Sequence, residues 1–265
     1  MLEERTNRRN CHIGSMDHSH RIVRPLKLAF GTCIIFATTP DAIYVVADTE
    51  RSIIDFEDGT ESVAPACKIA KLGVNVLGRS VYAAIAGLTW RDKSAFDALA
   101  TCKRVFDPSK SMEGNLELIE SDVDKPYWAT IKDLTNTLAG SELSAGAKSV
   151  AGKFERSLHI TLFGFESETP VISASKFLPG SDNPLKECVV GPNPFPSYLM
   201  GLSERFQHVG LMPANNQLGI KEQLEEWMKR SYSYLGRQCP EYAILRVGGN
   251  GEEQWLTPSA ACKDF

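Results

Sequence analysis

A hydroxyl, a carboxylate and an amine occur at regular places in the first third of the chain. Gly31-Thr32 stands directly before an apolar run, Asp48 follows the next apolar run, Lys68 opens a third, and Ala86-Gly87 closes a fourth. A threonine hydroxyl is a weak nucleophile and needs a base to remove its proton as it attacks a carbonyl carbon. Cys33, the neighbour of Thr32, carries a thiol, which is a better nucleophile.

The hydrophobic pattern predicts strands around these residues. The apolar runs 33–37 and 43–47 flank the turn residues 39–42 and predict a hairpin, whose near-continuous apolar strands are typical of a sheet buried on both faces. Further strands are expected at 67–72, 80–87, 159–165, 170–177, 188–191, 242–247 and 254–256. Helices are expected at 90–106, 127–154, 198–206 and 220–235, with polar segments at 50–65 and 107–126 between the elements.

This order of elements predicts an α+β fold. Strand hairpins alternate with grouped helices, and regular βαβ alternation is absent, which disfavours a Rossmann-like sheet. Two packed antiparallel sheets with helices on both outer faces satisfy the pattern best.

Charge divides the chain into a basic leader and an acidic body. The net charge is −4, which disfavours a nucleic-acid partner, and no apolar run approaches the roughly 20 residues of a membrane span. Residues 1–31 hold six basic and three acidic residues. Because Lys27 interrupts the apolar segment near residue 28, a propeptide is favoured over a secretory signal, which stays an open alternative.

The seven cysteines are scattered and odd in number. They form no C-x-x-C pair, so neither a disulfide framework nor a zinc site is expected, and a reducing, cytoplasmic compartment fits. No metal and no cofactor is expected.

The order Gly-Thr, strand, Ala-Asp-Thr, strand lysine and Ala-Gly resembles the proteasome β subunits and the related bacterial proteasome-like protease. These are N-terminal-nucleophile hydrolases. Here Asp48 lies 16 residues after Thr32, as in that family, and Lys68 and Ala86-Gly87 match the later positions. The segment between Asp48 and Lys68 is about four residues longer than the family pattern. The match covers residues 31–105 well and is topological from there to about 258.

The resemblance implies a fold and a mechanism. The fold would be a four-layer αββα sandwich, with a leader at 1–31, a catalytic domain at 32–258 and a tail at 259–265. Cleavage after Gly31 would expose Thr32, whose α-amine would serve as its base. Lys68 would lower the pKa of that amine, Asp48 would hold Lys68, and the Gly87 N–H would stabilise the oxyanion. Ser52 and Ile85 would line the substrate pocket.

Two segments depart from the family pattern. Active members carry a Gly-Ser-Gly segment after the middle strands and an Asp…Ser-Gly-Gly segment after the last long helix. In this chain the corresponding residues are expected at 190–194 and 234–240, and both segments lack the expected serine and aspartate. Each candidate residue also has a structural interpretation, as a strand threonine, a strand-ending aspartate, a solvated lysine or a strand-to-helix glycine.

The resulting hypothesis is a self-processing threonine peptidase, active on peptide or other amide bonds. It would assemble with copies of itself, as a ring in the manner of the family, and would bind neither nucleic acid nor membrane. An ATPase partner is left open. Two alternatives remain, a non-catalytic structural or binding protein on the same fold, and a small-molecule amidase that uses Cys33. A slip from Thr32 to Cys33 would turn the nucleophile to the opposite strand face, which favours Thr32.

Overall fold

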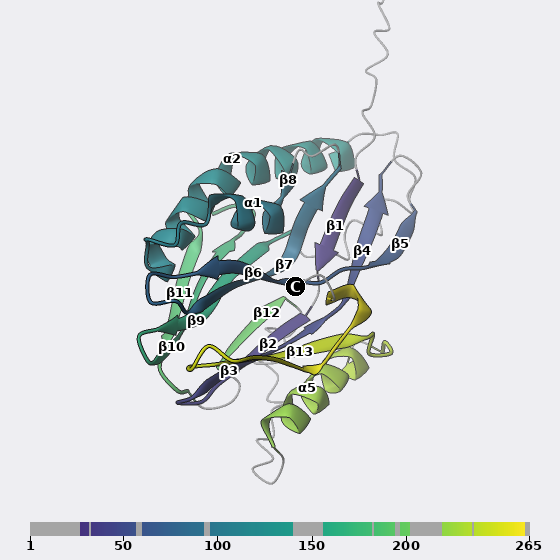
Figure 1. The fold of residues 1–265 in the computed structure, drawn as a ribbon. Coiled ribbons are helices and arrows are strands. Elements are labelled where there is room, and N and C mark those ends of the chain that lie inside the picture. The colour runs from purple at the N-terminus through teal and green to yellow at the C-terminus, as the bar shows by residue number, and fades with distance from the viewer. Residues whose placement is uncertain are drawn as a thin grey trace, which may run out of the picture.

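The computed structural model describes residues 27–31, 33–56, 60–92, 96–139, 156–181, 183–193, 197–201, 219–234 and 236–262. These residues form a mixed α and β structure with two antiparallel sheets (Figure 1). The strands are β1 (Lys27–Gly31), β2 (Cys33–Thr38), β3 (Ala42–Asp48), β4 (Glu50–Asp55), β5 (Glu61–Pro65), β6 (Ile69–Val74), β7 (Ser80–Arg91), β8 (Phe96–Asp97), β9 (Leu158–Glu166), β10 (Thr169–Phe177), β11 (Leu185–Val190), β12 (Tyr198–Gly201), β13 (Tyr242–Gly248) and β14 (Glu253–Thr257).

The first sheet has nine strands and the second has five. The strand order is β11-β10-β9-β7-β1-β4-β5 in the nine-stranded sheet, where β6 and β8 also pair with β7, and β12-β2-β3-β13-β14 in the five-stranded sheet. The α+β class expected from the sequence is confirmed at this level.

The hairpin β2–β3 forms the centre of the five-stranded sheet. Its register pairs Ile35 with Val46, and both strands are buried along nearly their whole length. Successive side chains point to opposite faces of the sheet, and both faces are buried, so both strands are continuously apolar. Ile34 and Phe36 face the nine-stranded sheet, whereas Ile35 packs against the helix on the other side. Burial on both faces, as the sequence predicted, is confirmed.

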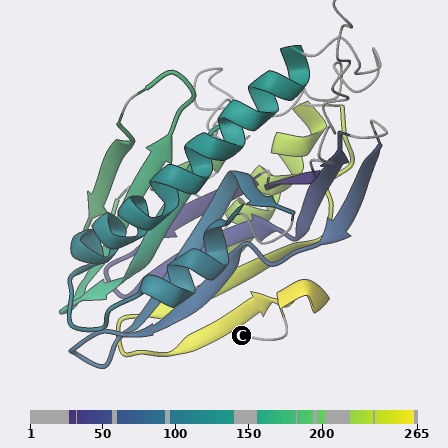
Figure 2. The ribbon, with the colours of Figure 1, turned by 90° about the horizontal axis from the view of Figure 1, so that it is seen from above.

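Helices cover the outer face of each sheet. The helices α1 (Ala98–Val105) and α2 (Met112–Ala139) lie across the nine-stranded sheet, and α5 (Ile220–Tyr234) lies under the five-stranded sheet (Figures 1 and 2). Leu116, Ile119 and Val123 of α2 pack on Leu162 of β9 and its neighbours, and Leu224 and Met228 of α5 pack on the other sheet. Apolar burial of this kind stabilises each helix far more than its intrinsic propensity does.

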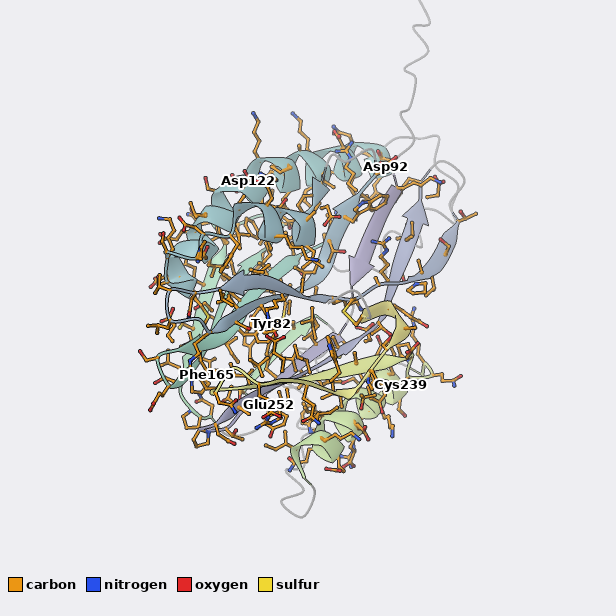
Figure 3. The ribbon with its side chains drawn as sticks, viewed as in Figure 1. Tyr82, Asp92, Asp122, Phe165, Cys239 and Glu252 are labelled. Atoms are coloured by element: carbon orange, nitrogen blue, oxygen red, sulfur yellow. A yellow bond between two sulfur atoms is a disulfide. The ribbon has the colours of Figure 1, made fainter. Side chains whose placement is uncertain are left out.

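A further apolar cluster, separate from the two that lie under the helices, fills the space between the sheets. Phe36 of β2 contacts Phe163 of β9 edge-to-face, with ring centroids 5.3 Å apart. Tyr82 and Phe165 lie in the same layer (Figure 3). The facing sheets therefore enclose one continuous core, and the chain must cross that core wherever it passes from one sheet to the other.

Such a crossing occurs between Gly31 and Cys33. β1 ends at Gly31 in the nine-stranded sheet, between β4 and β7, and β2 begins at Cys33 in the five-stranded sheet. Gly31 pairs with Gly87, and Phe30 pairs with Ser52 on the other side. Five residues of the expected leader are thus a strand within the larger sheet.

Several elements differ from the sequence predictions. The polar segment 50–65 contains two strands, β4 and β5, and α2 begins at Met112, within the segment 107–126 that had been assigned no helix. The helix expected from residue 90 begins at Ala98, because Trp90 still belongs to β7. Residues 198–201, expected to be helical, form β12. A short 3-10 turn, η1 (Ala260–Cys262), follows β14.

Candidate active site

Asp48 and Lys68 form a buried ion pair between the sheets. Asp48 ends β3 with 1% of its side chain exposed, and Lys68, directly before β6, is 3% exposed. The Lys68 ammonium donates a hydrogen bond to Oδ1 of Asp48. A buried charge is tolerated only with a partner, so each of these residues requires the other.

Two further donors fix the Asp48 carboxylate. The backbone N–H of Cys33 donates to Oδ1 over 3.0 Å, and the hydroxyl of Tyr232 on α5 donates to Oδ2 over 2.7 Å. The first bond ties the carboxylate to the start of β2, one residue after Thr32. Tyr232 could not be identified from the sequence, because the pattern of this segment indicates an amphipathic helix and nothing about the contacts of a single tyrosine.

The protonation of Lys68 is set by two opposing effects. Burial lowers the pKa of its ammonium below the usual value of 10.5, and attraction to Asp48 opposes this shift. The ion pair therefore holds the Lys68 ammonium beside the point where the chain passes from one sheet to the other. The Asp48 carboxylate that holds it accepts hydrogen bonds from Lys68, Cys33 and Tyr232.

The sequence-predicted residues Gly31, Asp48, Lys68 and Gly87 meet around this crossing. Thr32 itself lies outside the described residues. Its neighbours on either side are described: Gly31 pairs with Gly87, and Cys33 donates to Asp48. The solvated-lysine interpretation of Lys68 is wrong, since its side chain is buried and paired.

Gly87 occupies a position that only glycine fits. Its φ of +81° lies in the left-handed region, and a Cβ there would stand 2.0 Å from the carbonyl oxygen of Ser157. That carbonyl accepts a hydrogen bond from the N–H of Leu88 over 2.8 Å. The backbone at Gly87 can therefore approach a neighbouring strand closely, which suits it to contact a bound chain.

A pocket of about 260 Å³ opens beside the ion pair. Its lining includes Lys68, Ile85 and Thr89, together with Arg51 and Trp90, two residues that the sequence analysis did not identify. Of the two residues that the resemblance assigned to a substrate pocket, Ile85 is part of this lining and Ser52 is not. Ser52 is buried in β4 next to Arg51, where it pairs with Phe30.

The two segments that depart from the family pattern lie at different distances from this site. Gly191 accepts a hydrogen bond from the Thr38 hydroxyl, so 190–193 adjoin the end of β2 farthest from Cys33. It is Gly201, the last residue of β12, that pairs with Cys33. The equivalence assigned to 190–194 is therefore wrong, and the missing serine there does not bear on the site.

The second segment does lie near Asp48. The N–H of Arg237 donates to the carbonyl of Tyr232, the residue whose hydroxyl binds Asp48. Within 234–240, Tyr234 has no described side chain and Leu235 is not described. The hydroxyl of Tyr232, near the end of the helix that precedes this segment, thus contacts the ion pair.

The side chain of Cys33 faces away from the pocket. It has no exposed surface and packs with Ile35, Val46 and Met228 in the cluster against α5.

Cys67 and Cys262 form a disulfide, which the expectation of no disulfide framework did not foresee. The bond joins the residue before Lys68 to η1, across a sequence separation of 195. A spacing rule cannot reveal such a pair, because the two residues become neighbours only through the fold.

We expect the disulfide to be a major contribution to stability. Replacing Cys262 by serine should lower the free energy of unfolding by about 2–5 kcal/mol, because the unfolded chain regains the freedom of a very long closed loop. Denaturant titration of the oxidised protein measures the loss. Cys188, an exposed free thiol, provides the control as Cys188→Ser. Equal unfolding free energies for the Cys262→Ser and Cys188→Ser proteins would contradict a stabilising role.

The described residues contain no group of three or more His, Cys, Asp or Glu side chains that could hold a metal ion. None of the described helices has the length and apolar character to cross a membrane. Comparison of the chain with protein-family models and with curated proteins finds no match.

Proposed function

We propose that this protein is a self-processing amide hydrolase of the N-terminal-nucleophile type, with Thr32 as its nucleophile. The observation that carries the proposal is the position of the crossing between the sheets. Residue 32 lies between Gly31, which pairs with Gly87, and Cys33, whose N–H binds the carboxylate partner of Lys68. The helices on both outer faces of two packed sheets also agree with the four-layer αββα sandwich of that superfamily.

The first reaction would be cleavage of the chain itself. The Thr32 hydroxyl would attack the carbonyl carbon of Gly31, the bond between Gly31 and the Thr32 nitrogen would break, and water would release the leader from the resulting ester. β1 supports this step because it holds Gly31 in a fixed register against β7. Precise positioning of the reacting carbonyl is a major source of rate in such reactions.

The second reaction would be hydrolysis of an external amide. Once free, the Thr32 α-amine would act as the base, since an α-amine titrates near about 8 and a neighbouring ammonium lowers its pKa further. Lys68 is the ammonium that the site offers, and Asp48 keeps it charged. A peptide would take the place that β1 occupies, pairing with β4 and β7 as an added strand.

The burial of Cys33 favours Thr32 over the thiol. Cys33 packs into the apolar cluster against α5, and its N–H is committed to Asp48. Processing after residue 32 would require both contacts to break.

Intact mass spectrometry of the purified protein tests the proposal. A chain that begins at Thr32, accompanied by hydrolysis of amide-linked fluorogenic peptides, is the expected result. A wild-type chain that keeps residues 1–31 and hydrolyses no such peptide would contradict it. Assembly into a ring and a cytoplasmic location remain predictions.

A further inference from the structure

The pocket beside the ion pair contains a cation with an unsatisfied donor. The Nε atom of Arg51 is buried and has no hydrogen-bond partner among the residues that the structure describes. The guanidinium lies over the ring of Trp90, with Cζ 5.7 Å from the ring centroid. A contact of this kind holds the planar guanidinium in one orientation. The N–H groups of the guanidinium lie in its own plane and stay available for hydrogen bonds.

Among the described residues, the charged side chains that line the pocket are Arg51, Lys68, Lys103 and Asp97. Lys103 on α1 is exposed to solvent. The Asp97 carboxylate caps α1 by accepting the N–H of Ala100 over 2.9 Å. Lys68 is paired with Asp48. The carboxylate in this described lining thus already serves the helix.

The pocket adjoins the place where a substrate residue would precede the cleaved bond. Its lining includes residues of β4 and β7, the two strands that flank β1, together with residues 66–68, Asp97 and part of α1. Arg51 is one residue from Ser52, the partner of Phe30, and Ile85 is two residues from Gly87, the partner of Gly31. Gly31 has no side chain to offer this space.

We propose that the pocket binds the side-chain carboxylate of a glutamate or aspartate, with Arg51 as its anchor, so that cleavage follows acidic residues. This inference rests on the proposed hydrolase function. A volume of about 260 Å³ suits a single side chain better than a whole small-molecule ligand, for which pockets of about 300–1,000 Å³ are typical. Arg51 supplies a planar fork of N–H donors that matches a carboxylate.

Peptide amides that differ only in the residue before the fluorophore test the proposal. We expect kcat/KM for the glutamate peptide to exceed that for the isosteric glutamine peptide by about 10- to 100-fold, the range for a hydrogen bond to a charged group in a partly buried site. Arg51→Met keeps the length of the side chain and should remove this difference. Lys103→Met removes an exposed cation from the same pocket and should reduce the difference only a few-fold.

Equal rates for glutamate and glutamine in the wild-type protein, or a preference for leucine or lysine, would overturn the acidic specificity while leaving the hydrolase function intact. Circular dichroism and cooperative unfolding establish that Arg51→Met is folded.

If the leader is removed but no peptide is hydrolysed, calorimetric titration of the processed protein with the same peptide amides separates the two proposals. Tighter binding of the glutamate peptide that disappears in Arg51→Met would support the pocket and count against the hydrolase. Absence of any such preference in binding would overturn the pocket as well.

Discussion

Replacing Thr32 by alanine is expected to abolish both self-cleavage and peptide hydrolysis. The variant lacks the hydroxyl that would attack the Gly31 carbonyl, so the chain should keep residues 1–31 and show at least a 10³-fold lower kcat, as expected when a catalytic nucleophile is removed. Intact mass and hydrolysis of a fluorogenic peptide amide measure the two losses. Circular dichroism and cooperative unfolding establish whether the variant is folded.

Two neighbouring variants make this result specific. Thr32→Ser keeps a hydroxyl and should still be processed, whereas Cys33→Ala removes the adjacent thiol and should be processed at the same bond. Loss of processing in Cys33→Ala, with full processing in Thr32→Ala, would assign the nucleophile to the thiol and support the amidase alternative.

Replacing Lys68 by methionine is expected to remove activity and to destabilise the protein. Asp48 would remain as a buried carboxylate with two neutral donors, the Cys33 N–H and the Tyr232 hydroxyl. Removing one partner of a buried pair typically lowers the free energy of unfolding by about 3–5 kcal/mol. Without the ammonium, the α-amine of Thr32 should titrate higher, so any residual hydrolysis should shift its pH profile to more alkaline values.

A double variant separates stability from catalysis. In Asp48→Asn/Lys68→Met both charges are absent, and much of the lost stability should return, since uncharged replacements of a buried ion pair are often well tolerated. Activity should stay absent. Hydrolysis at the wild-type rate in the double variant would show that the pair is structural only. Tyr232→Phe, which removes one donor to Asp48, should have a smaller effect on both quantities.

The pH dependence of stability gives an independent measure of the same pair. Because burial lowers the pKa of Lys68, the folded protein binds fewer protons than the unfolded chain between that lowered pKa and 10.5. The free energy of unfolding contributed by this group therefore rises with pH across that window. In Asp48→Asn the largest effect that opposes burial is removed, so the rise should be larger than in the wild type. A smaller rise in Asp48→Asn would contradict the assigned coupling.

The sequence was sufficient to predict the part of the fold that local pattern controls. The hairpin β2–β3 is buried on both faces, so its residues are almost continuously apolar and its strands could be recognised. The resemblance also placed Asp48 at the end of one strand and Lys68 at the start of another. Their mutual contact and their burial required coordinates.

Elements with a weak hydrophobic pattern were missed. β4 pairs with β1 and with β5, and both β4 and β5 carry enough polar and exposed residues to look like a loop. In α2, acidic residues between Leu116, Ile119 and Val123 hide the helical period, and Pro126 suggests a break. The helix continues past Pro126, and its apolar face packs on the nine-stranded sheet.

The position of β1 has a consequence for the protein after maturation. Once the leader departs, β4 and β7 would each present a row of unpaired backbone groups, and the β4–β5 hairpin would lose its hydrogen-bonded link to the remaining strands. Such open edges attract extended chains without regard to sequence. The mature form should therefore aggregate more readily than its precursor, and a tightly bound peptide inhibitor should restore the solubility that the leader provides.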